Sequence, residues 1–328
     1  MFFYLKDKFL SYCFFFVILT NYYYIEKDMK KFDIQGTGVA LVTPFYKQGN
    51  VDFTSYEKLI NHVIEGGVDY LVCMGTTSEY PTLNQQEIMA CVDFAIDVNA
   101  GRVPIVLGMG GNDTRLLIDT IKKTDLTNIS AILSVTPYYN KPGQKGIYAH
   151  YKAVAEASPV PVILYNVPGR TGVNINADTC LQLANDFPNI IGIKEASGNI
   201  MQCMEILANK PSNFTVVSGE DALVMPLMAL GMQGVISVTA NALPQQMSEM
   251  VNYCLKSNFK KAKIVHEDLL PFSKAIFEEG NPVGIKAALE ILGVCQNNLR
   301  LPLVKSSKQL YSKIQTIVNN IQSNNNQK

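Results

Sequence analysis

Eight short apolar runs, rich in β-branched residues and separated by amphipathic stretches, are the feature that most constrains this chain. The runs are Gly36–Pro44, Asp69–Gly75, Val103–Met109, Ser130–Pro137, Pro161–Asn166, Ile190–Ala196, Phe214–Gly219 and Gly234–Ala240. Such nearly unbroken runs are typical of parallel strands that are covered on both faces. The repeated strand–helix alternation predicts an α/β protein with a (β/α)8 barrel, the TIM-barrel fold.

An open, doubly wound sheet is the alternative architecture. Such sheets usually have fewer strands, and no convincing G-x-G-x-x-G motif follows the first predicted strand. The nearest match is Gly108–Asp113, which we interpret as a tight turn. The barrel is therefore the preferred prediction.

Turn and capping residues predict the ends of several helices between the strands. The pair Gly66–Gly67 should end the first helix, and Asn84 with Glu87 forms a capping-box pattern before another. Asn112 and Asp178 are predicted to cap the helices that follow them.

Beyond Ala240 the pattern is helical throughout. We therefore divide the chain into a barrel at 32–255 and a C-terminal helical region at 256–328, preceded by an N-terminal extension at 1–31. The extension has an apolar run of only Tyr12–Leu19, which is too short to span a bilayer.

The N-terminal extension is expected to be a disordered tail or the product of a misassigned start, with Met29 as the natural first residue. A weak export signal is the alternative, because lysines precede the apolar run, although no small-residue cleavage site follows it. The intact mass of the protein from its native host distinguishes these possibilities.

Charge and composition exclude several kinds of partner. Lysine and arginine balance aspartate and glutamate at 28 each, which argues against nucleic acid and anionic membranes as partners. The seven cysteines are scattered without a C-x-x-C pair, which is typical of a reducing compartment and predicts a cytoplasmic protein. The three histidines lie far apart in the sequence, so no metal cofactor is expected.

Polar residues gather directly after the predicted strands, where the active site of such a barrel lies. The relevant segments are "GTTSE" (Gly75–Glu79), "TPYYNKPG" (Thr136–Gly143), "YNVPGRTG" (Tyr165–Gly172), "KE" (Lys194–Glu195) and "SGED" (Ser218–Asp221). The C-terminal end of the barrel is therefore the predicted site.

Lys194, near the end of the sixth run, is the first candidate for catalysis. It alternates with Gly192 on one face of the strand, so both should point into the barrel, and the glycine should leave room for a ligand. Burial favours the uncharged form of an amine, which can attack a carbonyl to form a Schiff base. The alternative is a structural lysine that reaches from the strand end into solvent.

The other candidates could assist such a lysine. Tyr165 could relay protons through a chain formed with Thr77 and Tyr139, although tyrosines at strand ends are often packing residues. Arg170 suits bidentate capture of a substrate carboxylate, unless it is an ordinary surface arginine. Thr76 and Thr77 could bind a carboxylate or simply cap a helix.

Two further residues of this region receive structural interpretations. Glu79 is a candidate structural acid that holds the turn after the second strand. Cys73 ends that strand without a histidine nearby in the sequence, so we do not expect a thiol nucleophile.

In order and spacing, the motifs resemble the pyruvate-dependent class I lyases, and within them the dihydrodipicolinate synthase family. The resemblance covers Phe32 to Leu310 and rests on "GTTSE", "TPYYNKP", "LYNVPGRTG", "IGIKEASG", "SGED" and "GVISVTAN". It implies condensation of pyruvate with L-aspartate-4-semialdehyde in the diaminopimelate route to lysine. It also implies that no metal or organic cofactor takes part and that the protein is a homotetramer built as a dimer of dimers.

The resemblance also implies roles for individual residues. Lys194 corresponds to the Schiff-base lysine, and Tyr165, Thr77 and Tyr139 to the proton relay, in which the last tyrosine comes from a neighbouring subunit. Thr76 belongs to the pyruvate site and Arg170 binds the carboxylate of the aldehyde. Gly219 and Ile236 line the pyruvate pocket.

This sequence departs from the family pattern at two places. Ser78 replaces the second glycine of the usual G-T-T-G-E turn, and a small residue still fits there. At the lysine feedback site of regulated members, Asn112 and Tyr138 match, but Leu116 cannot accept a hydrogen bond from an ammonium. Other departures there are Tyr80, Pro81, Gln85 and Ile88. We therefore expect weak or absent feedback inhibition.

Two other functions remain open. An N-acetylneuraminate lyase or a 2-keto-3-deoxy sugar acid aldolase would share Lys194 and Tyr165, but these enzymes generally lack the arginine that follows the tyrosine motif. A non-enzymatic oxo-acid sensor with an inert lysine is the second. Borohydride reduction in the presence of pyruvate separates the sensor from the enzymes.

Overall fold

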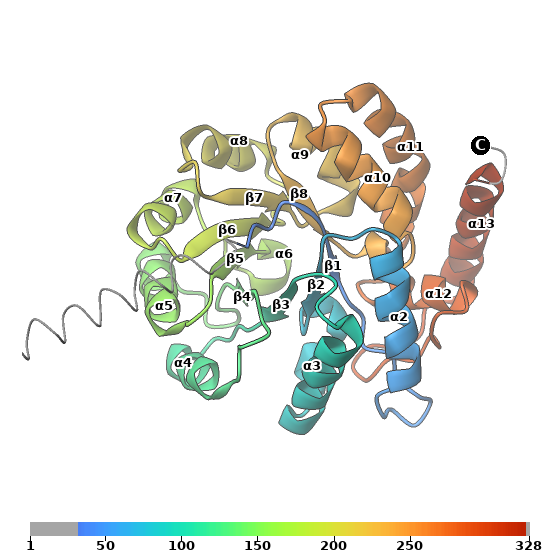
Figure 1. Cartoon of the computed structure of the whole chain (residues 1–328), viewed down its shortest axis with the longest axis horizontal. Helices are drawn as coiled ribbons and strands as arrows, with labels where there is room; N and C mark the ends of the chain where they lie inside the picture. Colours follow the sequence, from blue (N-terminus) through green and yellow to red (C-terminus); the bar gives the residue numbers. More distant parts are fainter. Residues whose placement is uncertain (1–31, 326–328) are drawn as a thin grey trace, which may run out of the picture. The chain divides into compact units, whose positions relative to one another are not determined.

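The computed structural model describes residues 32–325, in which eight parallel strands close into a barrel (Figure 1). The strands are β1 (Gly36–Ala40), β2 (Tyr70–Cys73), β3 (Ile105–Gly108), β4 (Ala131–Val135), β5 (Val162–Asn166), β6 (Ile190–Glu195), β7 (Thr215–Ser218) and β8 (Gly234–Ser237). Each strand pairs with the next one, and β8 pairs with β1. The predicted barrel is confirmed, and the open sheet is excluded.

Helices form a layer outside the strands (Figure 1). They are α2 (Phe53–Glu65), α3 (Gln85–Asn99), α4 (Thr114–Lys123), α5 (Gln144–Ala157), α6 (Pro168–Thr171), α7 (Ala177–Asp186), α8 (Ile200–Asn209), α9 (Val224–Ala229) and α10 (Pro244–Leu255). Short 3₁₀ turns follow several strands: η1 (Thr76–Ser78), η2 (Tyr80–Thr82), η3 (Asp221–Leu223) and η4 (Thr239–Asn241).

Three more helices follow the barrel: α11 (Phe259–Ala275), α12 (Val283–Ile291) and α13 (Lys308–Asn325). α11 packs against α10, and α13 packs against both α11 and α12. The predicted C-terminal helices are present. The region was expected to begin at residue 256, and α10 ends at Leu255. The predicted extension at 1–31 lies outside the described residues. Between residues 32 and 325, no helix is long and apolar enough to cross a membrane.

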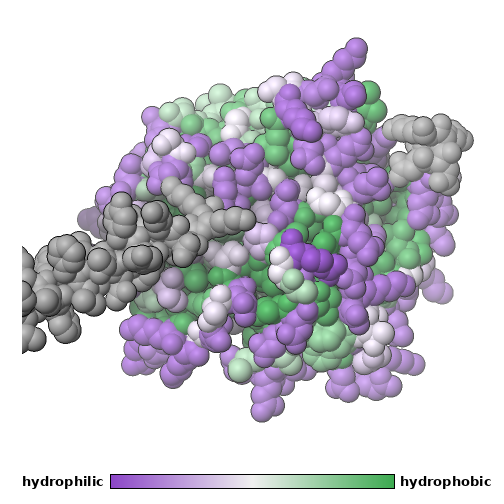
Figure 2. All heavy atoms as spheres, in the orientation of Figure 1, coloured by the Kyte–Doolittle hydropathy of each residue, from purple (hydrophilic) through white to green (hydrophobic). Residues whose placement is uncertain are grey.

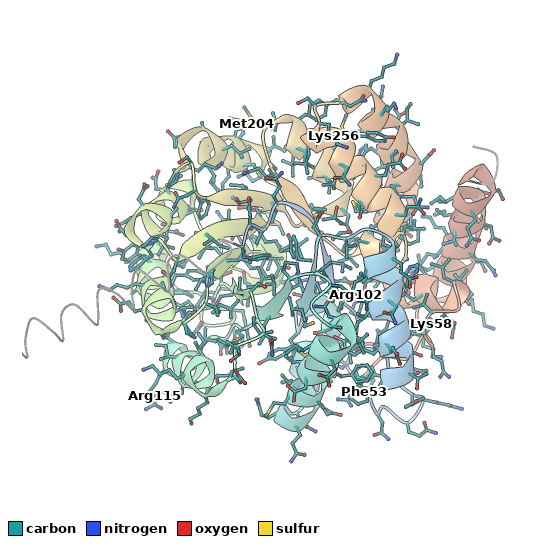
Figure 3. All side chains as sticks on the ribbon, in the orientation of Figure 1. Phe53, Lys58, Arg102, Arg115, Met204 and Lys256 are labelled. Carbon is teal, nitrogen blue, oxygen red and sulfur yellow. The ribbon has the colours of Figure 1, made fainter. Side chains whose placement is uncertain are left out.

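The strands are buried on both faces because side chains of the barrel interior cover one and the helices cover the other. On α2, for example, Leu59, Ile60 and Val63 are fully buried. Hydrophilic side chains occupy most of the outline of the face in Figure 2, with hydrophobic ones between them, mainly toward its middle. In Figure 3 the labelled side chains of Lys58, Arg115 and Met204 come from the outer helices. This pattern explains why short apolar runs alternate with amphipathic segments.

Two of the predicted helix ends are confirmed. Asn84 accepts a hydrogen bond from the backbone N–H of Glu87, whose carboxylate accepts one from the N–H of Asn84, forming a complete capping box. Gly66 is the C-cap of α2.

The two other predicted caps are wrong. The N-cap of α4 is Asp113 rather than Asn112, and its carboxylate accepts bonds from the backbone N–H groups of the second and third residues after it. A charged acceptor also interacts favourably with the positive end of the helix dipole. Asp178 lies inside the first turn of α7, whose N-cap is Asn176.

Candidate active site

Lys194 lies near the end of β6 and directly beside Tyr165 of β5. The strand register pairs these two residues, and the lysine Nζ lies 4.4 Å from the centroid of the tyrosine ring. Both residues are buried, and only 5% of Lys194 is exposed. Among residues 32–325, no carboxylate forms an ion pair with this amine. The barrel therefore holds an amine next to a phenol, largely out of contact with solvent.

The prediction that Gly192 leaves room for a ligand is wrong. A Cβ atom at Gly192 would lie 2.3 Å from the carbonyl oxygen of Thr215 and 2.8 Å from Cδ1 of Ile34. The glycine is therefore needed because the backbone of β7 and an apolar side chain pack closely against it.

Gly219 is the glycine that makes room for the lysine. A Cβ atom there would lie 2.9 Å from Cε of Lys194 and 2.6 Å from Cβ of Ala196. The absence of a side chain after β7 therefore lets the lysine side chain occupy this space.

The turn after β2 carries the two threonines. Thr77 is only 1% exposed, and its Oγ1 accepts a hydrogen bond of 2.9 Å from Nδ2 of Asn281. The hydroxyl of Ser78 donates to the carbonyl oxygen of Gly75 at 2.7 Å, so the serine is accommodated within the turn. The departure from the family pattern at this position is therefore compatible with the geometry.

A cleft of about 370 Å³ opens beside the turn and brings several of the candidates together. Its lining includes Thr76, Tyr165 and Arg170, together with Asn281 from the C-terminal region. Arg170 is exposed on the short helix α6, and its guanidinium lies 3.5 Å from the carbonyl oxygen of Asn281. A cation near the opening of a partly apolar cleft suits recognition of a carboxylate.

Five of the candidates are not among the residues that line this cleft: Lys194, Thr77, Gly219, Tyr139 and Ile236. Lys194 is nevertheless adjacent to it, because it pairs in the strand register with Tyr165 of the lining. Tyr139 is 89% exposed and has a left-handed backbone conformation with φ of 71°. Ile236 is completely buried in β8, where it pairs with Gly38 of β1.

An acidic residue that the sequence reasoning left without a role, Glu220, lies within electrostatic range of the site. Burial raises the pKa of its carboxyl and Asp221 raises it further, whereas the positive charges of Lys194 and Arg170 lower it. The "SGED" segment indicated acids here, but their burial could not be read from the sequence.

Cys73 behaves as predicted. Burial raises the pKa of its thiol to about 12, and the hydroxyl of Tyr56 donates to its sulfur at 3.8 Å. A thiol with this pKa is protonated near neutral pH and is a poor nucleophile.

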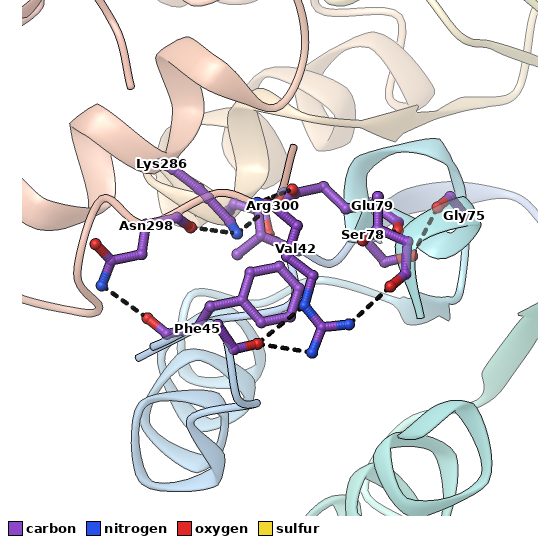
Figure 4. A network of polar contacts seen from close by, with 11 residues as sticks. Val42, Phe45, Gly75, Ser78, Glu79, Lys286, Asn298 and Arg300 are labelled. Atoms are coloured by element: carbon purple, nitrogen blue, oxygen red, sulfur yellow. Dashed lines mark hydrogen bonds and ion pairs between the residues drawn. The ribbon is translucent and has the colours of Figure 1, made fainter. Parts of the chain in front are cut away.

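Glu79 is confirmed as a structural acid. Its carboxylate is fully buried and lies 2.5 Å from Nζ of Lys286, while its second oxygen accepts a bond of 2.9 Å from the backbone N–H of Arg300 (Figure 4). Both partners come from the C-terminal region, which therefore holds the turn after β2.

The residues assigned to a feedback site surround two hollows beside the cleft. Asn112, Tyr138, Tyr80 and Leu116 line a hollow of about 210 Å³, and Gln85 and Ile88 line its neighbour. Leu116 is largely exposed. Weak feedback by lysine stays a prediction.

Across the part of the chain that the structure describes, no group of three or more histidine, cysteine, aspartate or glutamate side chains could hold a metal ion.

Comparisons with known proteins agree with this geometry. The model of the dihydrodipicolinate synthetase family matches residues 33–321. The 4-hydroxy-tetrahydrodipicolinate synthase of Flavobacterium psychrophilum is 49% identical over 85% of this chain and 95% of its own length. That of Parabacteroides distasonis is 46% identical over 88% of this chain and 98% of its own length.

A solved structure gives the same result. The chloride-inhibited dihydrodipicolinate synthase of Acinetobacter baumannii, in complex with pyruvate, superposes with a TM-score of 0.86 at 40% identity, covering 88% of this chain and 99% of the other. Because a model of the whole family and close relatives match nearly the full described chain, this chain belongs to the dihydrodipicolinate synthetase family.

Proposed function

We propose that this chain condenses pyruvate with L-aspartate-4-semialdehyde, the activity of a 4-hydroxy-tetrahydrodipicolinate synthase. The observation that carries the proposal is the buried pair of Lys194 and Tyr165, with the lysine amine 4.4 Å from the tyrosine ring centroid. An amine that forms a Schiff base needs a neighbouring group that moves protons, and a phenol can serve.

The first half of the reaction activates pyruvate. The amine of Lys194 attacks the C2 carbonyl carbon, water leaves, and the resulting iminium loses a C3 proton to become an enamine. Tyr165 transfers the protons that these steps require, and Thr77 belongs to the same relay. Thr76 binds the pyruvate carboxylate, and Gly219 and Ile236 complete the pocket around it.

The second half forms the new carbon–carbon bond. The enamine attacks the aldehyde carbon, while Arg170 binds the carboxylate of the incoming substrate through its guanidinium. The amino group of that substrate then closes the ring and displaces the amine of Lys194. No metal or organic cofactor is required by this sequence of steps.

Tyr139 acts in this scheme from a neighbouring subunit. Tyr139 is 89% exposed in the single chain. The exposed residues Leu116 and Tyr138 line one hollow beside the cleft, and the exposed Met89 lines its neighbour. A second copy that covers this face would bury them and deliver the tyrosine to the opposing cleft. We propose a homotetramer built from such dimers, in the cytoplasm.

A direct assay separates this activity from its alternatives. Purified protein is incubated with pyruvate and L-aspartate-4-semialdehyde, and in parallel with N-acetylneuraminate and with a 2-keto-3-deoxy sugar acid. We expect turnover only with the first pair. Cleavage of either sugar acid at a comparable kcat/KM would contradict the proposal, and no turnover with any of them would favour the oxo-acid sensor.

A further inference from the structure

The C-terminal region supplies a side-chain hydrogen bond to Thr77. Nδ2 of Asn281 donates a hydrogen bond of 2.9 Å to Oγ1 of Thr77, although the two residues are 204 positions apart. Asn281 is 7% exposed and lies two residues before the first residue of α12. Because both groups are buried, this bond is protected from competition with bulk water.

The direction of this bond determines where the threonine proton can go. A hydroxyl has one proton to donate and lone pairs with which to accept. The amide of Asn281 donates to the oxygen, so the proton of Thr77 stays free for a different acceptor. Within residues 32–325, the hydroxyl of Thr77 donates to no protein group.

The C-terminal region also binds the turn after β2 at Glu79, two residues after Thr77. Lys286 pairs with one carboxylate oxygen of Glu79, and the backbone N–H of Arg300 binds the other (Figure 4). The ring of Phe45 covers both cations, at 4.2 Å from Nζ of Lys286 and 4.5 Å from Cζ of Arg300.

The backbone of the turn needs such support. Met74 and Glu79, on either side of the threonines, have φ values of 55° and 56°. Residues other than glycine adopt this left-handed conformation at an energetic cost, so tertiary contacts must maintain it.

We infer that Asn281 is a positioning residue for the condensation: its amide fixes the Thr77 hydroxyl as an acceptor and thereby directs the threonine proton into the relay with Tyr165. This inference rests on the proposed function. It assigns the C-terminal region a part in catalysis, in addition to its packing against the barrel.

The test compares three variants. Asn281→Ala removes the donor, and Asn281→Asp replaces it with a carboxylate of similar shape that can only accept at neutral pH. Asn99→Ala is the matched control, because Asn99 is also buried, at 3% exposure, and its Nδ2 donates a bond of 2.8 Å to the carbonyl oxygen of Val103 before β3, at the opposite end of the barrel.

For both Asn281 variants we expect kcat to fall roughly 10- to 100-fold, while KM for pyruvate changes less than about threefold. The aspartate variant should be the worse of the two, because its carboxylate would accept the threonine proton, and its kcat should depend more steeply on pH. Asn99→Ala should lose thermal stability but keep kcat within about twofold of the parent.

A double-mutant cycle with Thr77→Val separates positioning from general destabilisation. If Asn281 acts through the hydroxyl, then Asn281→Ala should reduce kcat no further when the hydroxyl is already absent. Additive losses in kcat, or an Asn281→Asp variant with parental kcat, would overturn the inference. A parent protein that fails to condense the two substrates would instead refute the proposed function.

Discussion

Replacing Lys286 with methionine should be among the most destabilising single changes in this protein. Lys286 is fully buried, with Nζ 2.5 Å from a carboxylate oxygen of Glu79 and 2.8 Å from the carbonyl oxygen of Asn298. Methionine has a similar length, so packing against Phe45 is largely kept. The substitution therefore removes the charge and leaves the glutamate carboxylate buried without its cation.

The expected loss in the free energy of unfolding is about 3–5 kcal/mol, the range observed when one partner of a buried ion pair is removed. The lower end applies here, because the backbone N–H of Arg300 still binds one carboxylate oxygen of Glu79. Burial lowers the pKa of Lys286, and the opposing effect of Glu79 offsets only part of this shift, so the buried ammonium depends on that carboxylate.

Urea unfolding of the parent, both single variants and the double variant Glu79→Gln/Lys286→Met measures this interaction. Since the neutral pair leaves no buried charge, the double variant should be more stable than Lys286→Met alone. Two results would refute the reasoning: a loss below about 1 kcal/mol for Lys286→Met, or a double variant whose destabilisation equals the sum of the two single losses.

Four further outcomes are expected. Gly219→Ala should slow formation of the pyruvate adduct at least tenfold, because its methyl group would crowd Cε of Lys194; Gly143→Ala, whose methyl meets nothing within 4 Å, is the control. Arg170→Lys should raise KM for the aldehyde about 10-fold or more without changing adduct formation with pyruvate. Burial lowers the pKa of His150 to about 4. On acidification this histidine therefore takes up a proton at a higher pH in the unfolded state than in the folded state. Between about pH 7 and pH 5 this residue should account for a loss of about 2 kcal/mol in unfolding free energy, which His150→Asn should abolish in urea titrations. Inhibition assays with L-lysine should give no half-inhibition in the submillimolar range, and such inhibition would contradict the departures at the feedback site.

The strands and the barrel could be predicted from the sequence because parallel strands have a local signature. Each strand is a short β-branched run that is buried on both faces, and all eight lie within the predicted segments. Helix ends were less predictable: Asn112 and Asp113 are both good capping residues, and the choice between them depends on the backbone geometry at that position.

The candidate site could be predicted in part. Lys194 and Tyr165 lie near the ends of β6 and β5, and Arg170 lies in the segment after β5. The ends of parallel strands necessarily meet at one end of a barrel. The prediction that Gly192 leaves room for a ligand was wrong because the sequence does not distinguish a glycine beside a ligand from one that packs against a neighbouring strand.

The contacts from the C-terminal region could not be predicted. Asn281 and Lys286 reach the turn after β2 across more than two hundred residues. No local pattern of charge or hydrophobicity encodes such a contact. Only the three-dimensional structure shows that the amide of Asn281 donates a hydrogen bond to the hydroxyl of Thr77.

The most direct test of the central claim is to locate the covalent adduct. The protein is incubated with pyruvate, reduced with borohydride, digested and analysed by mass spectrometry, with Lys194→Arg as the control. We predict one reduced pyruvate adduct on the peptide that carries Lys194, and none in the variant. An unmodified Lys194 peptide, or an adduct on a different lysine, would contradict the account.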